Sequence, residues 1–233
     1  MQEAQRQNFK DYKSLNDFFT RQLSPLARPI EDSIITSPAD GRVLYLGPVP
    51  NGRVEAVKGI SYSIERFLGE VPIPREGYSL QQITIYLSPS DCHRFHSPTN
   101  WNIRKRVHFP GDLLSVAPPL THVIEGLFNY NERVALSGTW INGFFSFIAI
   151  GAFNVGSICF YFDSELSTNC KKDSKLRERK FKHFSDPLLV PKGEEIGLFK
   201  FGSCIVLIFE MPQSFKFLVA PGDKVRIGQS LVK

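Results

Sequence analysis

The chain has 233 residues, of which 42% are hydrophobic, so it is long enough for one domain with a sizeable core. None of its four cysteines (Cys92, Cys159, Cys170 and Cys204) forms a CxxC pair, which argues against a zinc site and against a disulfide framework. The first ten residues lack the apolar stretch of a signal peptide, so we expect that any targeting or anchoring segment is absent from this chain.

The net charge of +5 is matched by a single segment, Lys171–Phe184, which holds seven Lys or Arg and two acidic residues. Two interpretations of this basic run stay open. It could be a solvated, mobile loop, or it could bind an anionic surface, either lipid or nucleic acid. Because basic and aromatic residues do not interleave elsewhere in an RNA-binding pattern, we favour lipid and expect no nucleic-acid partner.

The N-terminal region predicts an amphipathic helix that ends before Pro25. Its hydrophobic residues recur three and four positions apart: Phe9, Tyr12, Leu15, Phe18, Phe19 and Leu23. This face could dock on the protein core, or it could lie on a membrane with the two adjacent Phe side chains inserted. Ser24–Ile30 is expected to be an extended linker.

Short strands are predicted next. Ile34–Leu46 has the pattern of two strands joined by a turn at Asp40-Gly41, and Val54–Val57 and Ile83–Leu87 indicate further strands. Tyr62–Leu68 indicates one or two helical turns. Taken alone, Asp40 is most simply explained as a turn residue.

Two histidines, His93 and His96, follow the strand expected at Ile83–Leu87. A spacing of three would place them on one face if the segment were helical. Such a pair could bind a metal, but no third ligand with suitable spacing is evident, so two surface histidines are the simpler interpretation.

Gly143–Phe162 carries no charge over 20 residues and could span a bilayer by length. Its glycines, β-branched and aromatic residues favour two buried strands interrupted at Gly151–Gly156. Cys204–Phe209 is an unbroken apolar run, as expected for a strand buried on both faces. Gly202-Ser203 precedes it, which by itself indicates a turn, although glycine also lets another group approach its carbonyl.

Three of these stretches together resemble the phosphatidylserine decarboxylase family: Ser37–Gly41, Tyr86–Pro98 and Phe199–Glu210. Supporting similarities lie at Phe18–Ile30, Val57–Gly69, His108–Val116, Asn131–Gly138 and Asn154–Ile158, so the resemblance extends from about Phe18 to the end of the chain. The pattern is most similar to the animal mitochondrial branch of the family.

The resemblance implies a self-derived pyruvoyl cofactor, with no metal and no pyridoxal phosphate. Ser203 Oγ would attack the carbonyl of Gly202, and the chain would break between them into a large chain, 1–202, and a small chain, 203–233, that stay associated. Decarboxylation needs an electron sink, which the resulting ketone would provide. The resemblance assigns Asp40 to orient His96, His96 to act as the base in cleavage, and His93 to the decarboxylation step.

Three positions depart from the family pattern. Cys204 stands where the family usually has Thr, Cys92 where it has Tyr, and Phe153 where it has Thr. A thiol donates hydrogen bonds weakly, so slow processing is one expectation. This leaves open a poorly processed or inactive lipid-binding homologue of the family as the alternative function.

Two further functions have less support in the sequence. A lipoyl-type carrier is suggested by the C-terminal hairpin pattern, but Lys at a tight exposed turn is missing. A Ser-His-Asp hydrolase would need a G-x-S-x-G elbow between strand and helix, whereas Ser203 precedes a strand.

We therefore expect one mainly β domain of the α+β class over 1–233, with antiparallel sheets packed as a sandwich and short N-terminal amphipathic helices. Residues 1–30 would face the membrane. The expected function is decarboxylation of phosphatidylserine to phosphatidylethanolamine and CO2 at an anionic membrane surface. By resemblance the protein would lie at the mitochondrial inner membrane as a peripheral protein, and a homodimer is an open possibility.

Overall fold

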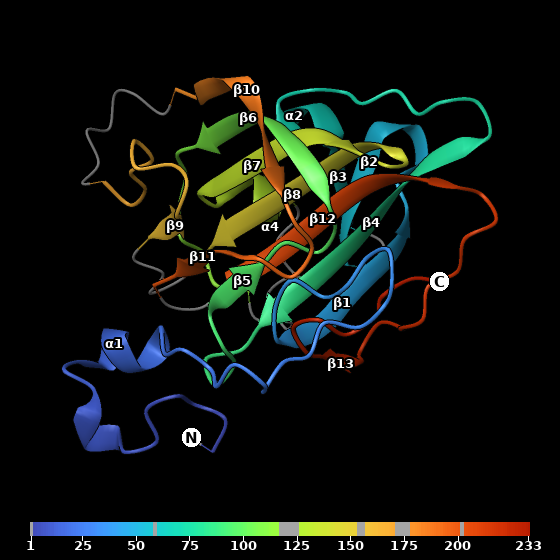
Figure 1. Cartoon of the computed structure of the whole chain (residues 1–233). Helices are drawn as coiled ribbons and strands as arrows, with labels where there is room; N and C mark the ends of the chain where they lie inside the picture. Colours follow the sequence, from blue (N-terminus) through green and yellow to red (C-terminus); the bar gives the residue numbers. More distant parts are fainter. Residues whose placement is uncertain (1, 58–59, 117–125, 153–156, 171–177, 201–202) are drawn as a thin grey trace.

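The computed structural model describes residues 2–57, 60–116, 126–152, 157–170, 178–200 and 203–233. Antiparallel strands dominate it, and its helices are short, as the sequence predicts (Figure 1). The helices are η1 (Phe9–Asp11), α1 (Leu15–Phe19), η2 (Pro50–Gly52), α2 (Ile64–Leu68) and α4 (Leu127–Tyr130). The strands are β1 (Gly41–Pro48), β2 (Arg53–Val57), β3 (Ile60–Ser63), β4 (Tyr78–Leu87), β5 (Arg94–His96), β6 (Trp101–Phe109), β7 (Arg133–Trp140), β8 (Gly143–Gly151), β9 (Ile158–Phe160), β10 (Lys180–Val190), β11 (Glu195–Phe199), β12 (Ser203–Pro212) and β13 (Lys224–Val225).

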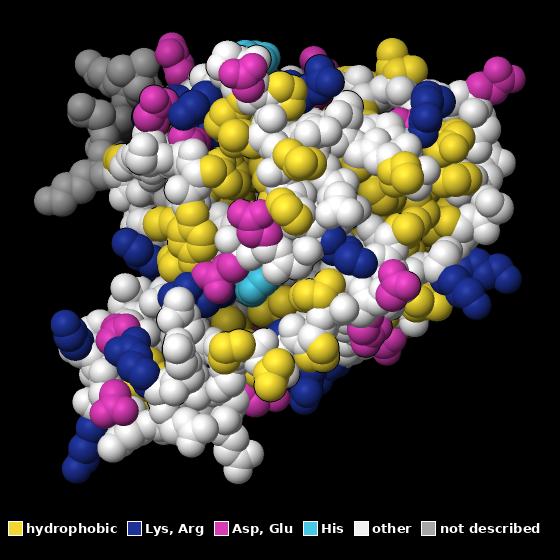
Figure 2. Space-filling model, viewed as in Figure 1, with side chains coloured by type: hydrophobic (Ala, Val, Ile, Leu, Met, Phe, Trp, Pro, Cys, Tyr) yellow, Lys and Arg dark blue, Asp and Glu magenta, His cyan; other side chains and the backbone are white. Residues whose placement is uncertain are grey.

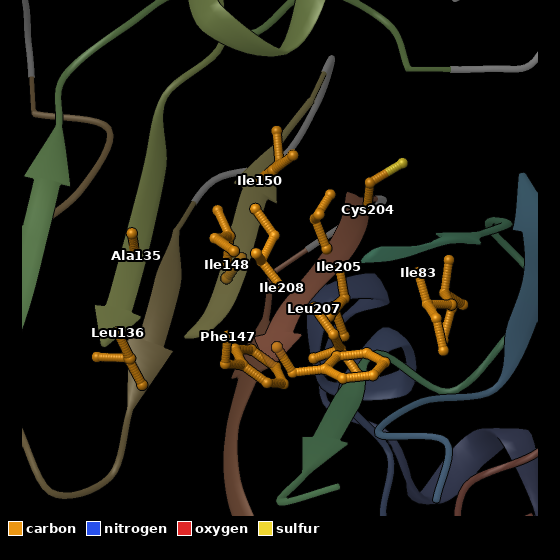
Figure 3. Packing of buried hydrophobic residues seen from close by; sticks show 14 of the residues in the cluster. Ile83, Ala135, Leu136, Phe147, Ile148, Ile150, Cys204, Ile205, Leu207 and Ile208 are labelled. Carbon is orange, nitrogen blue, oxygen red and sulfur yellow. The ribbon is translucent and has the colours of Figure 1, made fainter. Parts of the chain in front are cut away.

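One eight-stranded sheet, in the order β10-β6-β7-β8-β12-β4-β1-β13, forms the centre of the molecule. Strand β12 lies between β8 and β4 and pairs with both along most of its length. All six residues of the apolar run Cys204–Phe209 are fully buried. Figure 3 shows part of this run among hydrophobic side chains of the neighbouring strands. The prediction of a strand buried on both faces is therefore confirmed.

Each face of the central sheet is covered by a different layer. Side chains alternate along a strand, so Ser203, Ile205 and Leu207 point to one face, together with Phe147 of β8. The three-stranded sheet β5-β11-β9 covers this face, where the Phe147 ring packs on Phe95 of β5 with centroids 5.4 Å apart.

The opposite face is covered by β2, β3 and α2. Gln82 of β4 points to this face and donates a hydrogen bond to the Glu55 carbonyl of β2. The ring of Tyr62, on β3, packs against Phe67 of α2 with centroids 5.1 Å apart. Cys204 lies one residue after Ser203 and therefore faces this second layer.

The N-terminal region differs from the predicted continuous helix between Phe9 and Leu23. It contains the 3-10 turn η1 and the five-residue helix α1 instead. The backbone at Tyr12 is extended, which ends η1. The Ser14 hydroxyl caps α1 by accepting a hydrogen bond from Asp17 N at 3.1 Å. Serine favours a helix start over a helix interior, which explains the break.

The structure corrects two further expectations. The segment before Asp40-Gly41 is not a strand, although Thr36 forms an isolated bridge with Ser230. The interpretation of His93 and His96 as two surface histidines is also wrong, because His93 is fully buried and His96, at the end of β5, is only partly exposed.

The charge-free stretch Gly143–Phe162 contains β8 and β9, as predicted, with residues 153–156 between them outside the described part. Within the described ranges, no helix has the length and apolar character needed to cross a bilayer.

The second half of the basic run Lys171–Phe184 includes the start of a strand. Residues 171–177 lie outside the described part, but Lys180 begins β10, an edge strand of the central sheet. Lys182 forms ion pairs with Asp163 at 2.8 Å and Glu165 at 3.0 Å. The expectation of a single solvated loop over the whole run is therefore wrong for its second half.

Candidate active site

Ser203 is the first residue of β12, where it pairs with Leu87 of β4 and Gly151 of β8. Its side chain is fully buried, and its Oγ has no hydrogen-bond partner within the described residues. Leaving a buried hydroxyl unpartnered costs on the order of 1–3 kcal/mol, so such a group needs an explanation. The expected partner in cleavage, Gly202, lies outside the described residues.

His93 is fully buried and immediately precedes β5, a strand of the layer that covers the face to which Ser203 points. Its carbonyl accepts a hydrogen bond from Phe199 N at 2.8 Å, which ties it to the end of β11. Its Nδ1 lies 2.9 Å from the Asp91 carbonyl oxygen. A carbonyl can only accept, so Nδ1 carries the proton and Nε2 keeps its lone pair.

That Nε2 is buried without a partner in the described part of the chain. Burial lowers the pKa of His93 to about 4, because the charged form is poorly solvated there. His93 is thus a neutral imidazole with one unused nitrogen, whose lone pair can accept a hydrogen bond from a group that reaches it.

His96 has a more polar surrounding. Its Nε2 lies 3.9 Å from Glu195 Oε2, and its Nδ1 is buried without a partner among the described residues. Burial lowers its pKa, and the charges of Glu195 and Asp40 act against that shift. Glu195 is held in turn by hydrogen bonds from Arg94 and Tyr161.

Asp40 lies next to an arginine that sequence reasoning did not single out. Arg28 donates from Nε to Asp40 Oδ1 at 2.8 Å and from Nη2 to Oδ2 at 2.6 Å, and Ile227 N also donates to Oδ1 at 2.9 Å. The Asp40 hydrogen bond raises the pKa of Arg28 further. In the part of the chain described, Asp40 forms no hydrogen bond with His96, and neither histidine bonds to Ser203 Oγ.

Two cavities open at this site and share part of their walls. One, of about 300 Å³, is lined by His96 and Glu195, and the other, of about 260 Å³, is lined by Asp40. Arg28 and Cys92 line both cavities. The structure therefore places Asp40 and His96 around neighbouring spaces, with Arg28 between them.

The N-terminal segment contributes directly to the site. Phe19 of α1 is buried, and its ring packs on the His93 ring with centroids 4.2 Å apart. Arg94 Nε donates to the Thr20 carbonyl at 2.8 Å, which fixes the end of α1 beside β5. The docking alternative is thus correct for Phe19, which is not available for insertion into a membrane.

The departures from the family pattern fall in different places. Cys204 is fully buried on the face opposite to Ser203, and burial raises the pKa of its thiol. Cys92 is buried in the wall of both cavities, and burial raises its pKa to about 11. Phe153 lies outside the described residues. A residue at 204 therefore does not project its side chain toward the serine hydroxyl.

Sequence reasoning missed Arg28 and Glu195. Arg28 lies in the segment predicted only as a linker, where Pro25 and Pro29 were the local signs of a fixed backbone. Glu195 begins β11, which pairs with His96. Neither contact follows from local sequence, because Asp40 lies twelve residues after Arg28 and Glu195 pairs with His96 from a distant strand.

Comparison with known proteins shows which family the chain belongs to. A sequence model of the phosphatidylserine decarboxylase family matches residues 15–233. The chain is 44% identical to the mitochondrial phosphatidylserine decarboxylase proenzyme of Pongo abelii, over 99% of this chain and 63% of that protein. It is 43% identical to the corresponding proenzyme of Caenorhabditis elegans, over 97% of this chain and 60% of that protein.

A third relative, proenzyme 1 of Saccharomyces cerevisiae, is 35% identical over 99% of this chain and 65% of its own length. The chain thus spans less than two thirds of the length of these curated relatives. With the family match extending over nearly all of its residues, the chain belongs to the phosphatidylserine decarboxylase family.

Proposed function

We propose that this protein decarboxylates phosphatidylserine to phosphatidylethanolamine and CO2, using a pyruvoyl group that it makes from its own Ser203. The observation that carries this proposal is the buried, unpartnered Oγ of Ser203 at the start of a central strand, in a chain of this family. The relatives are named proenzymes, which fits a precursor that must be processed.

In the proposed processing step, Ser203 Oγ attacks the carbonyl carbon of Gly202 and the peptide becomes an ester. Elimination then breaks the Cα–H and Cβ–O bonds of Ser203, leaving a carboxylate on Gly202 and a dehydroalanine at residue 203. This enamine takes up water and loses ammonia, which gives the pyruvoyl ketone. No external oxidant or reductant is needed.

His96 is proposed as the base that accepts the Ser203 proton. Burial lowers the pKa of His96, and the nearby carboxylates of Glu195 and Asp40 act against that shift by favouring the protonated form that a proton acceptor reaches in the transition state. Asp40 would support this role through its charge, and Arg28 would fix its position. These two residues are positioning residues in this scheme.

His93 is proposed to handle a proton during turnover. Its Nδ1–H is committed to the Asp91 carbonyl, so Nε2 is the nitrogen free to exchange a proton with substrate. The pyruvoyl group, once formed, would supply the electron sink for loss of CO2. The apolar layer formed by Phe19 and Phe95 would exclude water from this side of the sheet.

We propose a single domain, with residues 1–30 facing a membrane and the protein located at the mitochondrial inner membrane. The relatives are named mitochondrial proteins. Several hydrophobic side chains of the N-terminal region are exposed: Phe9, Leu15 and Leu26. In Figure 2 the hydrophobic side chains on the visible surface lie mainly over the strands, and Lys, Arg, Asp and Glu are prominent on the N-terminal region at the lower left.

The test is an assay of phosphatidylserine turnover in vesicles by the wild-type protein and by Ser203→Ala. The wild type should release phosphatidylethanolamine and run as two chains on a denaturing gel, and Ser203→Ala should remain one chain without activity. A wild-type protein that is cleaved into two chains but does not decarboxylate phosphatidylserine would support the self-cleavage and contradict the proposed decarboxylation. A Ser203→Ala variant that still decarboxylates would refute the proposal.

The alternative of a poorly processed lipid-binding homologue rested mainly on Cys204. Because that side chain points away from the face of Ser203, the structure gives no specific support to it.

A further inference from the structure

A large cavity of about 830 Å³ lies on the α2 side of the central sheet, away from Ser203 and the two histidines. Four arginines line it: Arg53, Arg66, Arg133 and Arg179. Its lining contains no Asp or Glu among the residues described. We propose that this arginine cavity binds a phosphate group.

The cavity is separate from the candidate active site. Arg133 begins β7 and pairs with Ile150, which pairs with Cys204 of β12. Side chains that pair across neighbouring strands point to the same face, so Arg133 shares the face of Cys204 and not that of Ser203. A phosphate in this cavity would lie across the sheet from the serine hydroxyl.

Arg133 provides a fixed positive charge at the base of the cavity. Only 3% of it is exposed, and its guanidinium donates to the carbonyl oxygens of Phe67, Asn129, Asn131 and Arg66. It also stacks on the Phe109 ring at 4.0 Å from the centroid. These contacts hold the group in place without neutralising it.

A buried charge normally has a partner of opposite sign, because desolvation disfavours it otherwise. Within the described part of the chain, Arg133 has no such partner. Burial lowers its pKa to about 9, with the charge of Arg179 as a further cause. The guanidinium is still protonated at neutral pH, so the cavity has a permanent positive potential that an anion would balance.

The exposed arginines are placed to supply the direct contacts. The Arg179 guanidinium also lies against the Phe109 ring, 5.2 Å from its centroid, and Arg53 Nε donates to Ser61 Oγ at 2.8 Å. Arginine binds phosphate oxygens in paired, charge-assisted hydrogen bonds. No carboxylate in the described lining competes for these groups.

Tyr62 gives an independent indication of a ligand. It lines the cavity, is only 5% exposed, and its hydroxyl has no hydrogen-bond partner among the described residues. Burial raises its pKa well above the usual value, so the hydroxyl stays protonated and can donate. A phosphate oxygen that reached this buried hydroxyl would satisfy a donor that has no other partner among the described residues, and the arginines would bind the other phosphate oxygens.

Two sources could present this chemistry, a soluble phosphate ester and the headgroup of an anionic lipid. The experiment titrates the full chain with inorganic phosphate and with glycerol phosphate by calorimetry. Separately, it measures co-sedimentation with phosphatidylcholine vesicles that contain phosphatidic acid. The variants are the double substitution Arg53→Gln with Arg66→Gln, and Tyr62→Phe. Arg104→Gln, an exposed arginine outside the cavity, is the matched control.

Saturable phosphate binding should weaken about tenfold or more in the double variant, because the loss of one charge-assisted hydrogen bond lowers the affinity by about tenfold or more. Tyr62→Phe should also weaken it, and Arg104→Gln should not. If the same substitutions lower vesicle binding and free phosphate competes with vesicles, the source is a headgroup. If vesicle binding does not change, the source is a soluble phosphate. Equal binding by wild type and double variant, or an equal loss in Arg104→Gln, would overturn the proposal.

Discussion

His93 is held neutral by its burial, and this has a consequence for stability against acid. Its folded-state pKa of about 4 lies below the ordinary value of 6.5, so the unfolded chain binds the proton more readily. Stability should therefore be lost as the pH falls from 6.5 toward 4. The total effect is at most about 3 kcal/mol, at about 1.4 kcal/mol per pH unit.

His93→Gln should reduce this acid sensitivity, because glutamine does not titrate. Denaturant unfolding at several pH values between 4 and 7 would measure it, with His183→Gln on the edge strand as the control. An unchanged pH slope in His93→Gln would show that another group is responsible.

The two histidines of the site should differ in function. His96→Ala should slow self-cleavage by roughly 100-fold or more, the usual contribution of a general base. His93→Ala should be cleaved at least partly and then turn over poorly. Cleavage is followed by gel and turnover by product release. The opposite pattern would exchange the two roles.

Cys204 gives a test of side-chain direction. Because the residue 204 side chain faces the second layer, near Tyr62, Cys204→Thr should leave the cleavage half-time unchanged. Time courses of the two proteins on a gel would show this. Markedly faster cleavage by Cys204→Thr would mean that a hydroxyl at this position reaches the reacting peptide, contrary to the strand geometry.

At the scale of elements, the N-terminal segment divides into a docked part and an exposed part. Phe19 packs on His93, whereas Phe9 and Leu15 are 61% and 63% exposed. A fully inserted Phe or Leu side chain gains about 1.5–3 kcal/mol on leaving water. Phe9→Ser with Leu15→Ser should therefore lower salt-resistant vesicle binding several-fold.

Co-sedimentation at high salt measures this difference, since charge attraction is then screened. Ile141→Ser, at an exposed turn between β7 and β8, is the matched control because it removes similar apolar surface elsewhere. If both variants bind vesicles as the wild type does, the N-terminal segment does not enter the membrane.

Local sequence patterns predicted the elements in which the burial of the side chains follows one simple rule along the whole element. The apolar run Cys204–Phe209 predicted β12 because both of its faces are buried. The N-terminal periodicity failed, because the pattern shows which residues are apolar but not that the Ser14 hydroxyl would begin a new helix. Asp40, His93, His96 and Ser203 could be selected only by family resemblance, and their roles stay predictions.

The long-range contacts of the site could not be predicted. Arg28, within the predicted linker, forms an ion pair with Asp40 twelve residues later, and Glu195 lies beside His96 only because β11 pairs with β5. Such contacts depend on the path of the chain between the elements and on the order of the strands, neither of which local propensity determines.

At the scale of the whole molecule, the proposed cleavage would cut the chain immediately before β12, a buried strand inside the central sheet. The small chain, 203–233, would contain β12, which lies between β4 and β8, and β13, which pairs with β1. Its buried residues Leu231 and Val232 also belong to the core. The two chains should therefore stay together in native buffer and separate only in denaturant.

Size-exclusion chromatography followed by a denaturing gel would measure this association. A small chain that elutes alone from native buffer would contradict the central position of β12.

The chemical state of residue 203 decides most directly whether the proposed chemistry occurs, and intact-mass measurement of the purified protein under denaturing conditions determines it. We predict two chains that end at residue 202 and begin at residue 203. The small chain should be lighter, by one ammonia, than residues 203–233 with a free N-terminal serine, because the pyruvoyl group has lost that nitrogen. A single uncut mass, or a small chain with an intact N-terminal serine, would contradict the proposed function.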